Sequence, residues 1–97
     1  MISTHVLDTE LGEPAAGMKV GLYRGQEEIS LQETDENGRI EDLAEGPLDP
    51  GEYRLVFYVG GGFFERVDLT LAIVQSDAHY HVPLLVSPYQ CTTYRGS

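Results

Sequence analysis

The chain has 97 residues, and its sixteen carboxylate side chains outnumber six lysines and arginines, giving a net charge of −10. This negative charge disfavours nucleic acid and anionic membranes as partners, since phosphate binding requires a basic surface. The apolar content of 41% excludes a disordered chain, and the length predicts one domain over residues 1–97, with a core modest enough that oligomerisation could supplement it.

Alternation of apolar and polar residues, the period of a β-strand, recurs along the chain. In chain order, the predicted strands lie at residues 3–9, 18–24, 53–59, 66–74 and 79–87. The one candidate helix, around the segment EDLAEG, is too short and is closed by a Gly-Pro pair. Short strands separated by turn signals predict an all-β sandwich or barrel.

Two local signals concern the backbone. Asn37-Gly38 is the commonest dipeptide of tight β-hairpins, because both central residues need positive φ, so the sequence predicts a hairpin here. Arg39 then lies at the mouth of the hairpin, where an arginine is usually a solvated cation. Pro83 cannot donate to a strand ladder, so its strand is predicted to be an edge strand, or to bend or bulge beside His81.

Neither the cysteine content nor the first residues indicate secretion. Cys91 is the only cysteine, so the chain can form no internal disulfide and no cysteine-based metal site. The opening MISTHVLDT has neither the basic nor the apolar segment of a signal peptide, and no apolar run approaches the ~20 residues of a membrane span. We therefore expect a cytoplasmic protein.

The three histidines are the candidate chemical groups. His79 and His81 are two residues apart on a predicted strand, so their side chains point the same way. That spacing suits a metal site with His5 as a third ligand, acid–base catalysis, or a solvated structural pair, and spacing alone leaves these alternatives open. A serine nucleophile is not indicated, because no Gly-x-Ser-x-Gly motif is present.

Three segments together resemble a known family: THVLDTELGEPAAGMKVGLYR, TDENGRIEDL with GEYRLVFY, and HYHVPLLVSPYQCTTYRGS. They resemble the transthyretin-related 5-hydroxyisourate hydrolases over nearly the whole chain. The terminal Tyr-Arg-Gly-Ser is the most specific part, because the hormone-carrying transthyretins lack it. The resemblance implies a transthyretin-like sandwich of two four-stranded sheets. The short helix usual in the family is expected to be missing, since only YVGGG stands between Phe57 and Phe63.

The resemblance also implies a reaction and an assembly. The reaction is hydrolytic opening of 5-hydroxyisourate, the product of urate oxidase, to 2-oxo-4-hydroxy-4-carboxy-5-ureidoimidazoline, without a metal or organic cofactor. The assembly is a homotetramer, a dimer of dimers, with its sites at the dimer–dimer interface.

Site residues carry over from the family motifs position by position. His5, Arg39 and His81 match the catalytic residues, and His79 is left as a structural or supporting residue. The matched substrate-binding residues are Tyr94, Arg95, Gly96 and Ser97. The alternatives to a hydrolase are a non-catalytic transthyretin-like tetramer that binds a small molecule, and a purely structural β-sandwich.

Overall fold

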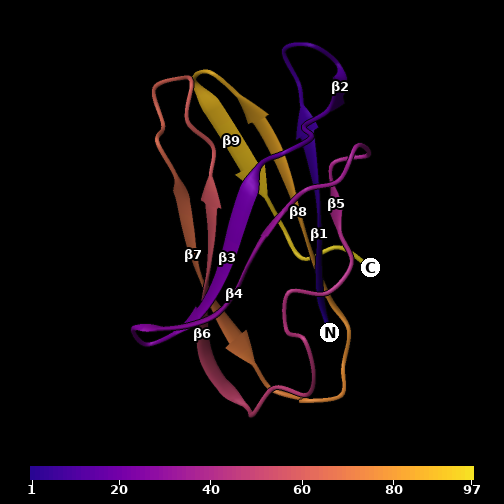
Figure 1. The fold of residues 1–97 in the computed structure, drawn as a ribbon, viewed down its shortest axis with the longest axis vertical. Coiled ribbons are helices and arrows are strands. Elements are labelled where there is room, and N and C mark those ends of the chain that lie inside the picture. Colours follow the sequence, from indigo (N-terminus) through magenta and orange to yellow (C-terminus); the bar gives the residue numbers. More distant parts are fainter.

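Two stacked β-sheets make up the molecule, and no helix is present (Figure 1). The computed structural model describes all of residues 1–97. The strands are β1 (Ile2–Asp8), β2 (Glu13–Pro14), β3 (Lys19–Arg24), β4 (Glu27–Glu33), β5 (Arg39–Ile40), β6 (Gly51–Tyr58), β7 (Val67–Ile73), β8 (Tyr80–Ser87) and β9 (Gln90–Thr93). The predicted all-β class and the missing helix are confirmed. None of the elements is a helix of the length and apolarity that a membrane crossing requires.

Each sheet is built around one central pair of strands. The β1–β8 sheet has the order β2-β1-β8-β9, and the two-residue strand β5 also pairs with β1. The β3–β6 sheet has the order β4-β3-β6-β7. All pairs are antiparallel except β1 with β8, which run parallel over seven residue pairs. The expected two four-stranded sheets are thus present, and β5 is an addition to the first of them.

The alternating pattern of the sequence sorts residues between core and surface as predicted. In β8, Tyr80, Val82 and Leu84 are buried, and they pack against buried residues of β1, β3 and β6. Full burial of a large apolar side chain stabilises a fold by about 1.5–3 kcal/mol. The core between the sheets, listed from β3 and β6, includes Val20, Leu22, Tyr53, Leu55 and Phe57.

The hairpin predicted at Asn37-Gly38 is absent, because β4 and β5 belong to different sheets. Only Gly38 of the pair has a positive φ, 75°. The carboxylate of Asp35 accepts hydrogen bonds from the amides of Asn37 and Arg39 at 2.8 and 2.9 Å, and so closes a turn on the crossover between sheets. The carbonyl oxygen of Gly38 accepts a hydrogen bond from the amide of Val6 at 2.7 Å, which brings β5 beside β1.

Pro83 lies on a central strand rather than the predicted edge strand, since β8 has β1 on one side and β9 on the other. Its carbonyl oxygen points to the β9 side, where it accepts a hydrogen bond from the Thr93 hydroxyl at 2.8 Å. The missing amide hydrogen faces that same side. Strand β9 ends at Thr93, and backbone pairing resumes only where the Gly96 amide donates to the His81 carbonyl at 2.7 Å. The proline therefore interrupts the ladder opposite the tail.

Candidate active site

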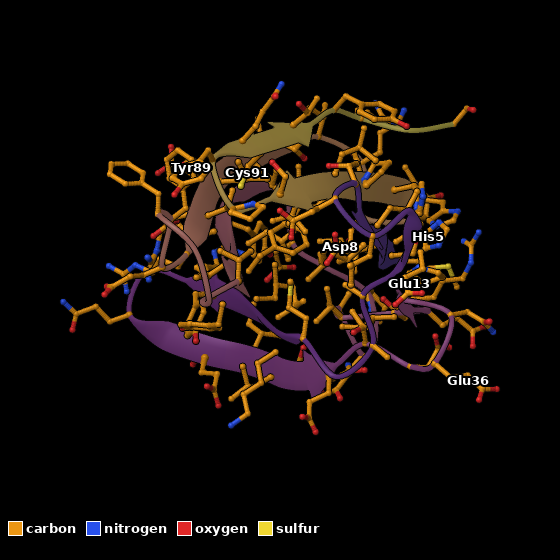
Figure 2. All side chains as sticks on the ribbon, turned by 90° about the horizontal axis from the view of Figure 1, so that it is seen from above. His5, Asp8, Glu13, Glu36, Tyr89 and Cys91 are labelled. Atoms are coloured by element: carbon orange, nitrogen blue, oxygen red, sulfur yellow. The ribbon has the colours of Figure 1, made fainter.

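The pairing of β1 with β8 and β5 gathers the three predicted catalytic side chains on one face. His81 lies opposite Ser3 in the β1–β8 pair, and His5 lies opposite Arg39 in the β1–β5 pair. Successive residues of a strand point to opposite faces, and the sequence neighbours of these residues point into the core. His5, Arg39 and His81 therefore project from the outer face. Figure 2 shows His5 on the side turned away from the β3–β6 sheet.

One ring nitrogen of His81 makes a hydrogen bond, and the other has no hydrogen-bond partner within the chain. Its Nδ1 lies 2.8 Å from the hydroxyl oxygen of Ser3, and its Nε2 makes no hydrogen bond within the chain. Burial lowers the pKa of His81, and the charge of Arg39 lowers it further, with smaller effects from His79 and His5 in the same direction. The imidazole is therefore neutral at pH 7, so its free nitrogen can accept a proton.

A cavity of about 510 Å³ opens beside this imidazole. Its charged lining residues have both signs, since Arg39 lines it together with Asp35 and Glu41. The lining residues come from the chain start, β1, the Asp35–Glu41 segment, the start of β8 and the last residue: Met1, Ser3, Thr4, Asp35, Arg39, Ile40, Glu41, His79, His81 and Ser97. His5 does not line it but lies beside Arg39 on the same face.

The end of the chain folds back across the β1–β8 sheet (Figure 1), where it pairs with His81. Gly96 forms an isolated antiparallel bridge with His81, and a Cβ added at Gly96 would lie 2.7 Å from Cδ2 of the imidazole. Only glycine fits this contact without displacing the ring. Ser97, the next residue, lines the cavity. Two of the four predicted tail residues thus lie at the predicted histidine and arginine site.

Ser3 is a member of this cluster that the sequence prediction missed. Its hydroxyl oxygen lies 2.7 Å from Nε2 of His79 as well as 2.8 Å from Nδ1 of His81, and the residue is only 9% exposed. The sequence did contain a signal for Ser3, because Ser3 and His5 are two residues apart on one predicted strand and therefore lie on the same face. The partner strand could not be read from that pattern.

Comparison with known proteins decides the family. A sequence model described as HIUase/Transthyretin family matches residues 2–96. The chain belongs to the HIUase/transthyretin family. It is 43% identical to 5-hydroxyisourate hydrolase 2 of Rhizobium meliloti, an alignment that covers 99% of this chain and 95% of that one.

Solved structures agree with this assignment. The 5-hydroxyisourate hydrolase of Klebsiella pneumoniae superposes with a TM-score of 0.92 at 35% identity, covering 99% of this chain and 97% of that one. Sea bream transthyretin in complex with thyroxine superposes with a TM-score of 0.84 at 24% identity, covering 98% of this chain and 93% of that one. The second likeness shows the shared fold alone.

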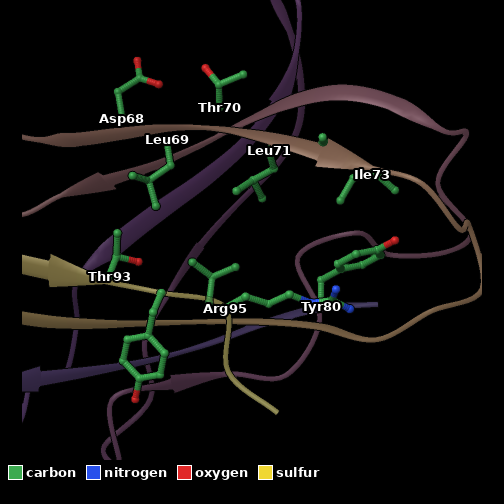
Figure 3. A pocket seen from close by; sticks show the side chains of 11 residues that line it. Asp68, Leu69, Thr70, Leu71, Ile73, Tyr80, Thr93 and Arg95 are labelled. Atoms are coloured by element: carbon green, nitrogen blue, oxygen red, sulfur yellow. The ribbon is translucent and has the colours of Figure 1, made fainter.

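The other two tail residues of this HIUase/transthyretin family chain lie at a different cavity. Tyr94 and Arg95 line a cavity of about 450 Å³ between β7 and the β8–β9 side of the sandwich. The guanidinium of Arg95 lies 4.6 Å from the centre of the Tyr80 ring, a cation–π distance (Figure 3). Within a single chain, these two side chains are not brought to the cavity of His81.

The histidines of this family member do not form a metal site within the chain. No group of three or more His, Cys, Asp or Glu side chains is arranged so that it could hold a metal ion. His79 and His81, whose spacing left that alternative open, have ring centres 6.4 Å apart and share Ser3 instead.

Proposed function

We propose that this chain hydrolyses 5-hydroxyisourate to 2-oxo-4-hydroxy-4-carboxy-5-ureidoimidazoline. The observation that carries the proposal is the cavity in which His81, Arg39 and Ser97 meet, with His5 beside Arg39, in a chain whose relatives are named 5-hydroxyisourate hydrolases. The reaction needs a base for water, a cation for the developing oxyanion and a proton for the departing nitrogen. The cluster offers one group for each task.

His81 is the proposed base. Its lowered pKa keeps it neutral, and its unpartnered Nε2 can take a proton from a water molecule as the new oxygen–carbon bond forms at the ring carbonyl. The ring carbon–nitrogen bond then breaks, the nitrogen takes a proton, and the carbon becomes a carboxylate. His5, on the neighbouring strand, orients the water and shares the proton transfers.

Arg39 is the proposed clamp for the negative charge. Its planar fork pairs with the oxygens of a urate-like anion, and in the overall negative field of the protein such a local cation is required to hold that substrate. Stabilising the oxyanion can lower the barrier by about 3–4 kcal/mol. Gly96 and Ser97 form the wall beside His81 with a backbone and a hydroxyl group.

We further propose that residues 1–97 act as one domain in a cytoplasmic homotetramer. Strands β7 and β9 each form one edge of their sheets, and their outward backbone groups are free to pair with a second copy. Such pairing would cover the cavity beside Arg95 and half-exposed Tyr94, and would bring both tail residues into subunit contacts. Light scattering with size-exclusion chromatography measures the assembly, and a monomer at micromolar concentration would refute it.

The test of the reaction follows hydroxyisourate made in place by urate oxidase, using its ultraviolet absorbance. The wild-type chain should accelerate the decay, and Arg39→Ala and His81→Gln should each lower kcat/KM at least about 100-fold, because one oxyanion donor contributes about 10²–10³-fold and general acid–base catalysis about 10²–10⁴-fold. Arg66→Ala, at an exposed arginine on the β6–β7 connection, is the matched control and should keep full activity. Decay unchanged by the wild-type chain, together with retained binding, would instead favour the non-catalytic carrier.

A further inference from the structure

One serine hydroxyl is shared by two imidazoles at the site. Ser3 Oγ lies 2.7 Å from Nε2 of His79 and 2.8 Å from Nδ1 of His81. The parallel pairing of β1 with β8 places Ser3 directly opposite His81, so the backbone register of the sheet holds the two side chains together. Ser3 is nearly buried, whereas His79 is exposed to solvent. The three groups all line the cavity and form a path from His81 to the solvent-exposed His79.

Counting hydrogens restricts the states of this path. A hydroxyl has one hydrogen to donate, and a neutral imidazole has one donor and one acceptor nitrogen. Ser3 can therefore donate to only one of the two rings and must accept from the other. When Ser3 donates to His79, it accepts from Nδ1–H of His81, and the lone pair of His81 then lies on Nε2. That is the state in which His81 can act as a base toward the cavity.

We propose that Ser3 is a positioning residue that holds His81 in this tautomer and relays its Nδ1 proton to His79; the proposal rests on the function proposed above. As His81 Nε2 takes a proton from the attacking water, its Nδ1 proton moves to Ser3 Oγ, and the Ser3 hydroxyl proton moves to Nε2 of His79. One proton thus enters at the cavity and one arrives on His79. When the ring nitrogen departs, the transfers run in reverse: Nε2 of His81 gives its proton to that nitrogen, Ser3 returns a proton to Nδ1 of His81, and His79 gives one back to Ser3.

The charges around the path favour this direction. His81 faces the guanidinium of Arg39 on β5 and the imidazole of His5 on β1, and both disfavour a lasting positive charge on its ring. The remaining charged groups that line the cavity are the Met1 ammonium, Asp35 and Glu41. His79 is exposed, so solvent can stabilise its imidazolium until the proton returns through Ser3.

Three variants separate the role of the Ser3 hydroxyl as a hydrogen-bonding group from the transfer of a proton to His79. Ser3→Ala removes the bridge and should lower kcat at least about tenfold with little change in KM, a part of the 10²–10⁴-fold that acid–base groups supply. Ser3→Thr keeps a hydroxyl and should restore most of kcat. His79→Gln keeps a hydrogen-bonding group for Ser3 but cannot become a cation, so it should lower kcat while leaving His81 in the same tautomer.

The matched control is Ser30→Ala on the β3–β6 sheet. Ser30 is buried to the same degree as Ser3, and its hydroxyl also makes a hydrogen bond, to the Leu43 carbonyl at 2.5 Å. Its loss should lower the melting temperature without changing kcat. An equal fall of kcat in Ser30→Ala and Ser3→Ala would mean that only structure was lost, and the relay would be wrong.

The ¹⁵N chemical shifts of the imidazoles test the relay independently of turnover. In the wild-type chain at pH 7.5, His81 should carry its hydrogen on Nδ1, and Ser3→Ala should move that hydrogen to Nε2. The same tautomer in both chains, or unchanged kcat in Ser3→Ala, overturns the inference. If the wild-type chain does not hydrolyse hydroxyisourate, the proposed function fails, whereas the tautomer comparison still decides whether Ser3 controls His81.

Discussion

Gly96→Ala tests whether the tail positions the proposed base. The added Cβ would lie 2.7 Å from Cδ2 of His81, 3.5 Å from its Cγ and 3.3 Å from Cγ of Pro83. Carbon atoms rest at about 3.5–4.0 Å, so one partner has to move by about 1 Å. The tail cannot retreat without stretching the 2.7 Å hydrogen bond from the Gly96 amide to the His81 carbonyl. We expect the ring to move, and its 2.8 Å contact with Ser3 to lengthen.

We expect Gly96→Ala to lower turnover much more than folding stability. Misplacing a reacting group by 1 Å can lower turnover by about 100-fold, whereas losing one hydrogen bond costs about 0.5–1.5 kcal/mol of stability. The assay is decay of hydroxyisourate made in place, beside a thermal melt. Gly12→Ala is the control: its φ of 72° imposes a backbone strain that Gly96 does not carry, but nothing lies within 4 Å of the new Cβ, so stability should fall while kcat should not change. A Gly96→Ala chain with wild-type kcat would show that the tail does not set the position of His81.

Three further predictions concern two titrating groups, His81 and Tyr23. Burial and then Arg39 lower the pKa of His81 from its ordinary value of about 6.5. The pH at which kcat/KM declines on the acid side should therefore lie below 6.5, and Arg39→Lys, which keeps the positive charge, should leave that pH unchanged. For the same reason the unfolded chain binds more protons than the folded chain below pH 6.5, so the free energy of unfolding should fall as pH drops through that window, and less so in His81→Gln. The hydrogen bond between the hydroxyls of Tyr23 and Tyr58, at 2.8 Å, raises the pKa of Tyr23 to about 12; ultraviolet titration of Tyr58→Phe should show Tyr23 ionising nearer 10, with no change in kcat.

The faces of the strands could be predicted from the sequence, but their registers could not. Alternation correctly assigned Val82 and Leu84 to the core and His81 to the opposite face, since shifting a strand by one residue would turn every side chain over. A shift by two residues keeps every face unchanged. The pattern therefore could not tell that Ser3, rather than His5, lies opposite His81.

The wrong hairpin at Asn37-Gly38 and the misjudged Pro83 have related causes. Several types of turn contain a glycine with positive φ. Here the hydrogen bonds of the Asp35 carboxylate stabilise a turn type after which the chain enters the other sheet. A proline has no amide hydrogen. A central strand tolerates this wherever the neighbouring segment provides no acceptor for that hydrogen, because no ladder hydrogen bond is then lost. Opposite Pro83 that segment is the tail around Tyr94, a relation that only the folded chain creates.

The shortened β6–β7 connection and the proposed site lie at opposite ends of β8. In the connection, the amide of Phe63 donates to the carbonyl of Pro88 at 2.8 Å, so this segment packs on the β8–β9 turn (Figure 1). His81 precedes Pro88 by seven residues of extended chain, about 23 Å at 3.3 Å per residue. A change of loop length at one end reaches the other only through β8 itself, whose register with β1 is held by seven consecutive residue pairs. The β6–β7 connection can therefore leave Phe63 74% exposed to solvent without moving the imidazole that the proposed chemistry requires.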